Sequence, residues 1–245
     1  DNIQPGQSSK IVFMIRNDNG DLVKTFEIAH EKLMHFIVVR HDLQDFQHLH
    51  PDFNQLTGEF SVDVTFPSIG PYRIFPDFTP RDNNPQKLPF TVSSDIEVGD
   101  INRYTPISLP IDTENKKQSN GYEVTYLFPQ VDQLKAQTKI TYSLLVEKDG
   151  QPVTNLDNYL GAKGNSVIIK DRTLDYIHTH ALERVEELDQ VEHGGEHVAR
   201  QKKEISQGNQ IDFATTYPET GVYKIFTQFQ HQGKIITTDY VIQVK

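Results

Sequence analysis

Histidine is concentrated in one short stretch of this chain of 245 residues. The segment HEKLMHFIVVRHDLQDFQHLHPDF, residues 30–53, holds five of the ten histidines. Two of them, His48 and His50, are spaced i, i+2, and residues with that spacing face the same side of a β-strand. Such an H-x-H pair can hold a divalent metal ion between two imidazoles, although it can also be polar decoration on a sheet. The spacing therefore predicts a metal site if further ligands lie nearby.

Two more side chains could complete the ligand set. His35 precedes His50 by 15 residues across the RHDLQD turn, so we expect it on a neighbouring antiparallel strand. Asp77, in FPDFTP, adds a carboxylate on a later strand. Neutral imidazoles with one carboxylate suit Zn(II) or Cu(II), with affinity falling below about pH 6.5. The alternatives are an ordinary packed histidine at position 35 and an aspartate that binds the loop backbone.

The chain contains an internal repeat. Residues 17–50 align with residues 147–180 without a gap at an offset of 130, which sets Gly20 on Gly150. Residues 60–78 resemble residues 211–229 at an offset of 151, so the second copy carries 21 extra residues (151 − 130). Two copies of one fold are the simplest interpretation.

The second copy keeps only part of the candidate site. His178 and His180 repeat the H-x-H pair, but amides at Asn165 and Gln228 replace His35 and Asp77. The insertion brings two further histidines at i, i+4, which face one side of a helix, although it could equally be an acidic loop. The predicted second site is His178, His180, His193 and His197. The other histidines, His30, His41 and His231, are expected at the surface.

The elements that would position these side chains are strands. Runs such as SKIVFMIRN and KITYSLLVEKDG are rich in β-branched and aromatic residues and end in Asn/Asp-Gly turn signals. Strands every 8–12 residues predict an all-β chain of two tandem immunoglobulin-like β-sandwich domains. We expect the domains at residues 1–93 and 120–245, with a linker at 94–119. Helix-forming residues at about 181–208 predict a short helical insertion in the second domain.

Composition excludes several classes of function. With 34 acidic and 24 basic residues, the net charge of −10 argues against a nucleic-acid partner. The absence of cysteine excludes disulfides, thiolate catalysis and a blue-copper centre. No apolar run approaches the ~20 residues of a membrane span. Neither a G-x-S-x-G elbow nor a phosphate-binding glycine loop occurs.

The quoted histidine segment, followed by GPYRIFPDFTP, resembles a family of bacterial, usually exported β-sandwich proteins. These are described as YtkA-like or as copper- or heavy-metal-associated. The shared motifs are K-L-M-H, H-x-H-P and F-x-D-F, which His35, His48, His50 and Asp77 match. The second copy departs from them, with Asn165 where such sequences often show histidine. The resemblance implies cupredoxin/YtkA-like domains, a periplasmic or secreted location, and copper as the metal.

The preferred hypothesis is an extracytoplasmic protein that binds Cu(II), or alternatively Zn(II), as a chaperone, buffer or resistance factor. Its expected partners are the metal ion and either another envelope protein or a second copy of itself. One alternative is a structural or interaction module without a functional metal. Another is a metal-dependent enzyme in which Asp77 acts as a general base.

Overall fold

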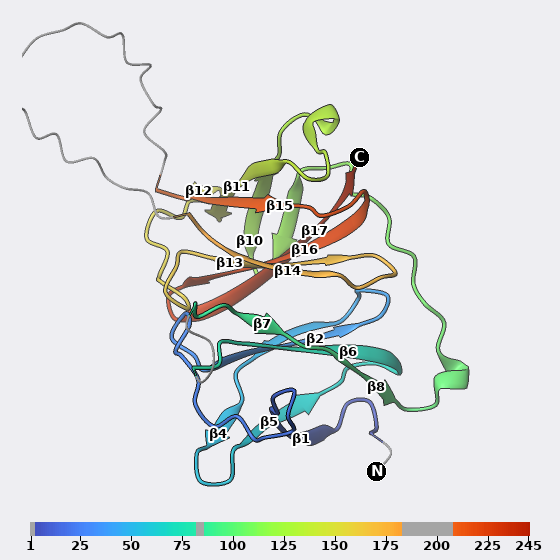
Figure 1. The fold of residues 1–245 in the computed structure, drawn as a ribbon. Coiled ribbons are helices and arrows are strands. Elements are labelled where there is room, and N and C mark those ends of the chain that lie inside the picture. Colours follow the sequence, from blue (N-terminus) through green and yellow to red (C-terminus); the bar gives the residue numbers. More distant parts are fainter. Residues whose placement is uncertain (1–2, 82–85, 183–207) are drawn as a thin grey trace, which may run out of the picture. The chain divides into compact units, whose positions relative to one another are not determined.

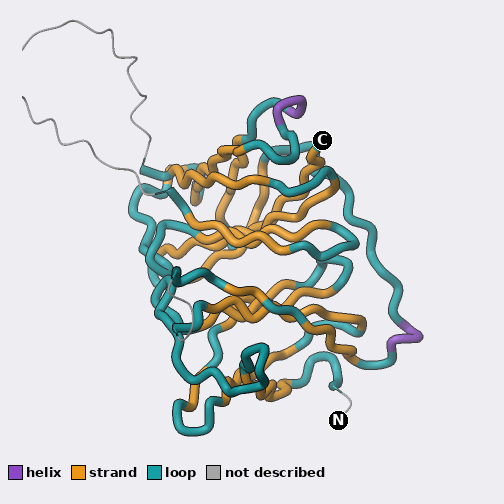
Figure 2. Tube along the Cα trace, viewed as in Figure 1, coloured by secondary structure: helices purple, strands orange, loops and turns teal. Residues whose placement is uncertain are grey.

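The structure is a computed structural model that describes residues 3–81, 86–182 and 208–245 (Figure 1). The described residues form strands and two single 3-10 turns, without an α-helix, which confirms the all-β prediction (Figure 2). The expected helix at about 181–208 falls almost entirely outside the described residues. No helix in the described ranges has the length and apolarity needed to cross a bilayer.

The chain divides into two compact units. The first comprises Asp1–Ile111, Ile169–Tyr176 and Val222–Lys224, and the second comprises Asp112–Ile168, Ile177–Gly221 and Ile225–Lys245. The strands up to residue 98 are β1 (Ser8–Met14), β2 (Met34–Arg40), β3 (Phe46–Leu49), β4 (Asp52–Asn54), β5 (Glu59–Thr65), β6 (Gly70–Phe78), β7 (Phe90–Thr91) and β8 (Ser94–Val98). The 3-10 turn η1 (Ile101–Arg103) follows.

The later strands are β9 (Lys116–Ser119), β10 (Tyr122–Leu127), β11 (Lys139–Lys148), β12 (Gln151–Pro152), β13 (Asn165–Lys170), β14 (Tyr176–His180), β15 (Gln210–Thr216), β16 (Gly221–His231) and β17 (Lys234–Val244). The 3-10 turn η2 (Val131–Gln133) lies between β10 and β11. Two strands, β8 and β9, occupy the ends of the segment expected to be a linker, and β8 pairs with β6.

Alternating side chains explain why these segments are strands. In β11, every second side chain from Ile140 to Val146 is buried, as expected for a sheet with one face on a core. The turns are built from residues that tolerate positive φ. Gln232 and Gly233, between β16 and β17, have φ of 52° and 71°, the backbone signs of a two-residue hairpin turn.

The first unit contains two sheets that share one apolar core. One sheet has the order β1-β5-β4, and the other has the order β3-β2-β6-β7, with β8 also paired to β6. The ring of Phe13 on β1 stacks on Phe36 of β2 at 5.3 Å and on Phe60 of β5 at 5.6 Å between ring centroids. Phe36 and Phe60 are fully buried. The packing is sandwich-like, since side chains of both sheets interdigitate.

The remaining sheets lie mainly in the second unit and repeat part of this order. One has the order β12-β11-β10-β9, with β15 paired to β11, and the other has the order β14-β13-β16-β17. Strand β13 therefore lies between β14 and β16 as β2 lies between β3 and β6. Both central strands, β2 and β13, are buried along their whole length. The repeated histidine segments consequently occur on equivalent strands.

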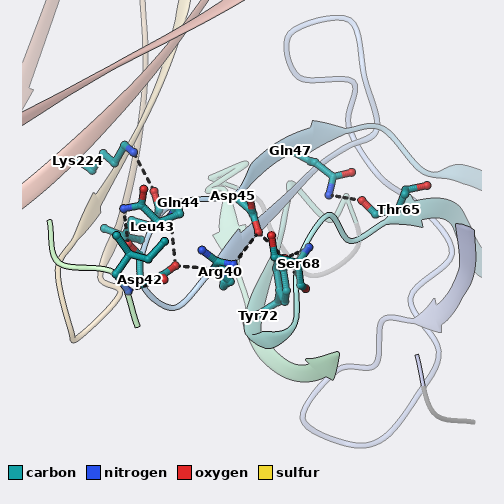
Figure 3. A network of polar contacts seen from close by, with 11 residues as sticks. Arg40, Asp42, Leu43, Gln44, Asp45, Gln47, Thr65, Ser68, Tyr72 and Lys224 are labelled. Atoms are coloured by element: carbon teal, nitrogen blue, oxygen red, sulfur yellow. Dashed lines mark hydrogen bonds and ion pairs between the residues drawn. The ribbon is translucent and has the colours of Figure 1, made fainter. Parts of the chain in front are cut away.

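A buried polar network holds the turn between β2 and β3 (Figure 3). The Arg40 guanidinium contacts Asp42 at 2.7 Å and Asp45 at 3.4 Å. The Tyr72 hydroxyl donates to Asp45 at 2.6 Å and accepts from the Ser68 amide at 3.2 Å. Burial and the Asp45 carboxylate both raise the pKa of Tyr72, so its hydroxyl remains a donor. These contacts fix the position at which β3 begins.

We expect Tyr72→Phe to lower the free energy of unfolding by about 1–3 kcal/mol, because it leaves the partly buried Asp45 carboxylate without its shortest hydrogen bond. Urea denaturation measures this loss. The same substitution in an Asp45→Asn background should cost less, since the two groups interact. Equal costs in both backgrounds would show that the hydroxyl does not act through Asp45.

Candidate metal centre

Strand register brings three histidines to one point. In the antiparallel pair β2–β3, Ile37 lies opposite His48 and Phe36 lies opposite Leu49. Continuing that register by one residue sets His50 opposite His35. Cross-strand neighbours on one face are close enough to interact both directly and diagonally. One candidate ligand atom from each of His35, His48 and His50 lies within 4.8 Å of the others.

The spacing of the three rings suits a common ion. The ring centroids are 5.2 Å apart for His35 and His48, 5.2 Å for His35 and His50, and 4.9 Å for His48 and His50. Imidazoles about 2.0–2.1 Å from a tetrahedral ion have ring centres about 5.2 Å apart. His35 is buried, whereas His48 and His50 are half-buried. The group could therefore hold a metal ion with little rearrangement.

Hydrogen bonds define the tautomer of His35. Its Nε2 lies 3.2 Å from the carbonyl oxygen of Ala29, which can only accept. In the neutral ring the proton is therefore on Nε2, and Nδ1 presents a lone pair. A metal-binding histidine commonly donates its second ring N–H to a backbone carbonyl in this way. Nδ1 of His35 is thus the atom oriented for coordination.

A hydrogen bond joins two of the candidate ligands, His35 and His48. His35 Nδ1 lies 2.9 Å from His48 Nε2, and because the first atom accepts, the second must donate. Two imidazole nitrogens on one tetrahedral ion lie about 3.3 Å apart. To bind an ion at this point, His48 would have to carry its proton on Nδ1 instead of Nε2, and the two nitrogens would separate by about 0.4 Å (3.3 − 2.9).

Asp77 lies next to this group but is not part of it. It pairs with His35 in the register of β2 and β6. Its carboxylate is not among the ligand atoms that lie within 4.8 Å of one another. Within the first unit, Asp77 Oδ2 accepts a hydrogen bond from the Tyr176 hydroxyl at 3.1 Å. The carboxylate is therefore engaged in a structural contact in this geometry.

The second copy uses the same framework with different chemistry. Asn165 occupies the position of His35, and its Nδ2 donates to the Tyr159 carbonyl at 2.8 Å, as His35 does to Ala29. His178 and His180 on β14 have ring centroids 4.5 Å apart. Among the described residues, no third His or carboxylate forms a ligand group with them. The predicted ligands His193 and His197 lie outside the described residues.

Two other histidines have structural contacts. His231, expected to be exposed, is instead only 4% exposed, which makes that prediction wrong. It lies between the Tyr122 hydroxyl at 2.8 Å and Asn155 Oδ1 at 3.1 Å, and these side chains satisfy both ring nitrogens. His41 is half-buried and contacts Asp95 at 3.1 Å. Sequence alone could not reveal the His231 contacts, because they join strands that are far apart in the chain.

Comparisons with known proteins define a family. A sequence model of the family described as Domain of unknown function (DUF8832) matches residues 1–96 and 117–245. A comparison with curated proteins gave no match.

Among solved structures, the chain is similar to an Escherichia coli alpha-2-macroglobulin activated by porcine elastase, with 11% identity and a TM-score of 0.27. That match covers 100% of this chain and only 19% of the other. It is also similar to the D00-D0 domain of intimin (10% identity, TM-score 0.24, covering 100% of this chain and 96% of the other). A chimeric titin Z1Z2-Z1Z2 tandem gives 10% identity and a TM-score of 0.20, covering 100% of this chain and 94% of the other.

We expect the metal-free protein at neutral pH to carry the His35 proton on Nε2 and the His48 proton on Nε2, as the hydrogen bonds require. Long-range ¹H–¹⁵N NMR correlations of the imidazole rings distinguish the two tautomers. In His48→Ala, the His35 tautomer should persist, because the Ala29 carbonyl still accepts a hydrogen bond from its Nε2–H. A proton on His35 Nδ1 in the unsubstituted protein would contradict this geometry.

Proposed function

We propose that this chain, which belongs to the DUF8832 family, is a metal-binding protein that holds one divalent ion among His35, His48 and His50. The observation that carries the proposal is the convergence of three imidazoles, one of them oriented by a backbone carbonyl. The half-buried His48 and His50 leave the ion a route to the site.

The ligand chemistry supports Zn(II) or Cu(II) over hard cations. Imidazole nitrogens suit these metals, whereas Ca(II) and Mg(II) prefer oxygen ligands. Our preference for Cu(II) rests on the resemblance to exported copper-associated proteins. The same resemblance underlies the proposed immunoglobulin-like, cupredoxin/YtkA-like fold and the proposed periplasmic or secreted location. In that setting the protein would act as a metal chaperone, buffer or resistance factor.

The proposal extends more weakly to the second copy. The pair His178 and His180 offers two imidazoles with ring centroids 4.5 Å apart, a spacing close to that of the first site. Its further ligands would be His193 and His197 from the insertion. Because Asn165 and Gln228 replace His35 and Asp77, the second copy lacks the preformed third ligand. We therefore propose that any ion there binds less tightly.

We expect titration of the full, untagged chain with Cu(II) or Zn(II) to show one tight site that His48→Ala combined with His50→Ala weakens by at least about 100-fold, because two of its three ligands are lost. The matched control is His178→Ala combined with His180→Ala, which removes the equivalent pair and should leave that site intact. Isothermal titration calorimetry and elemental analysis give affinity and stoichiometry.

Thermal unfolding provides a second measurement of the same proposal. An ion at 100 times its dissociation constant stabilises the folded state by about 2.7 kcal/mol, so the melting temperature should rise with metal and not in the His48, His50 double variant. Equal affinity in the two double variants would refute the assignment of the site. An absence of stoichiometric metal and of any melting shift would favour a structural module instead.

A further inference from the structure

The loop that orients His35 has an unusual composition. Residues 29–32 form a two-residue turn in which Ala29 and Lys32 exchange backbone hydrogen bonds of 2.9 and 3.1 Å. The central residues, His30 and Glu31, have φ of 49° and 67°. Such turns favour glycine and asparagine at these positions, because a left-handed backbone costs other residues about 1–2 kcal/mol each.

The same turn in the second copy shows that the fold does not require these side chains. Tyr159 and Ala162 exchange the equivalent hydrogen bonds at 2.8 and 3.3 Å. The central residues there are Leu160, which is buried and has a φ of 56°, and Gly161, whose φ of 77° carries no steric cost. Leucine replaces His30 in the copy in which asparagine replaces His35. In this chain His30 is therefore found in the same copy as its neighbour His35, and both are replaced in the other copy.

The His30 ring lies near His35, one of the three candidate ligands, although its nitrogens are not among the ligand atoms that lie within 4.8 Å of one another. Its centroid is 6.2 Å from that of His35, compared with the 4.9–5.2 Å among His35, His48 and His50. A fourth imidazole on a tetrahedral ion would need its ring about 5.2 Å from each of the other three rings, so the His30 ring must move closer to the group. His30 is exposed, and rotation of its side chain provides that movement without displacing β2.

We propose that His30 is the fourth ligand, so that four imidazoles enclose the ion and leave no coordination position for water or substrate. This inference rests on the proposed function. Four protein ligands are typical of structural metal sites, whereas catalytic, hydrolytic sites keep one coordination position open for water or substrate. A tetrahedral set of four imidazoles favours Zn(II) over the Cu(II) that the family resemblance suggests, and it fits metal binding rather than metal-dependent hydrolysis.

Three variants of the full chain test this ligand. His30→Asn removes the imidazole and keeps a residue that tolerates the left-handed turn, so the metal-free protein should melt no lower than the unsubstituted one. Glu31→Asn is the matched control in the same turn. Asp77→Asn tests the rival fourth ligand, the carboxylate opposite His35. Zn(II) and Co(II) are the probes, since tetrahedral Co(II) absorbs visible light strongly.

We expect His30→Asn to weaken Zn(II) binding by at least about 10-fold, because losing even an outer-shell partner of a ligand costs about that much, and Glu31→Asn and Asp77→Asn to change it by less than about threefold. Azide should leave the Co(II) spectrum of the unsubstituted protein unchanged and should alter that of His30→Asn, which has an open position. Unchanged affinity in His30→Asn, or azide binding to the unsubstituted protein, would overturn the His30 assignment alone. Failure of the unsubstituted protein to bind either probe would overturn the proposed function as well.

Discussion

The register between β2 and β3 is the constraint on which the candidate site depends. Successive side chains of a strand face opposite sides, so a slip of one residue would turn both His48 and His50 away from His35. The Arg40, Asp45 and Tyr72 contacts hold the turn that sets this register. A polar network without any role in metal chemistry therefore determines whether three imidazoles meet. Core packing through Phe13 and Phe36 then fixes β2 against the facing sheet.

The side chain that contacts one backbone carbonyl distinguishes the two copies of the repeat. The carbonyl of Ala29 accepts a hydrogen bond from His35, and the equivalent carbonyl of Tyr159 accepts one from Asn165. Both side chains satisfy the turn equally well as donors. Only the imidazole has a second nitrogen on the far side of its ring, which can bind an ion. A single residue type thus separates a site that could hold metal from a purely structural contact.

Sequence patterns predicted the strands and part of the site for identifiable reasons. Alternating side chains and Asp-Gly or Gln-Gly turns act locally, so strands such as β11 and β16 could be recognised directly. The H-x-H spacing likewise fixed a shared face for His48 and His50. The burial of His231 and the hydrogen bond between Asp77 and Tyr176 join distant segments, and no local pattern encodes them. His30 was expected at the surface, and its exposure confirms that expectation.

The 2.9 Å hydrogen bond between His35 and His48 bears on how the ligands would be held in a metal-free form of a metal-binding protein. Small zinc domains collapse without their ion, because nothing else orders the ligands. Here the apolar core and the hydrogen bond between the two rings hold the histidines together, so the fold itself does not depend on a bound ion. Binding and release of an ion would then require only a change in the His48 tautomer and a small movement of the two rings. Reversible binding of this kind suits the proposed role of a chaperone, which must release its metal ion.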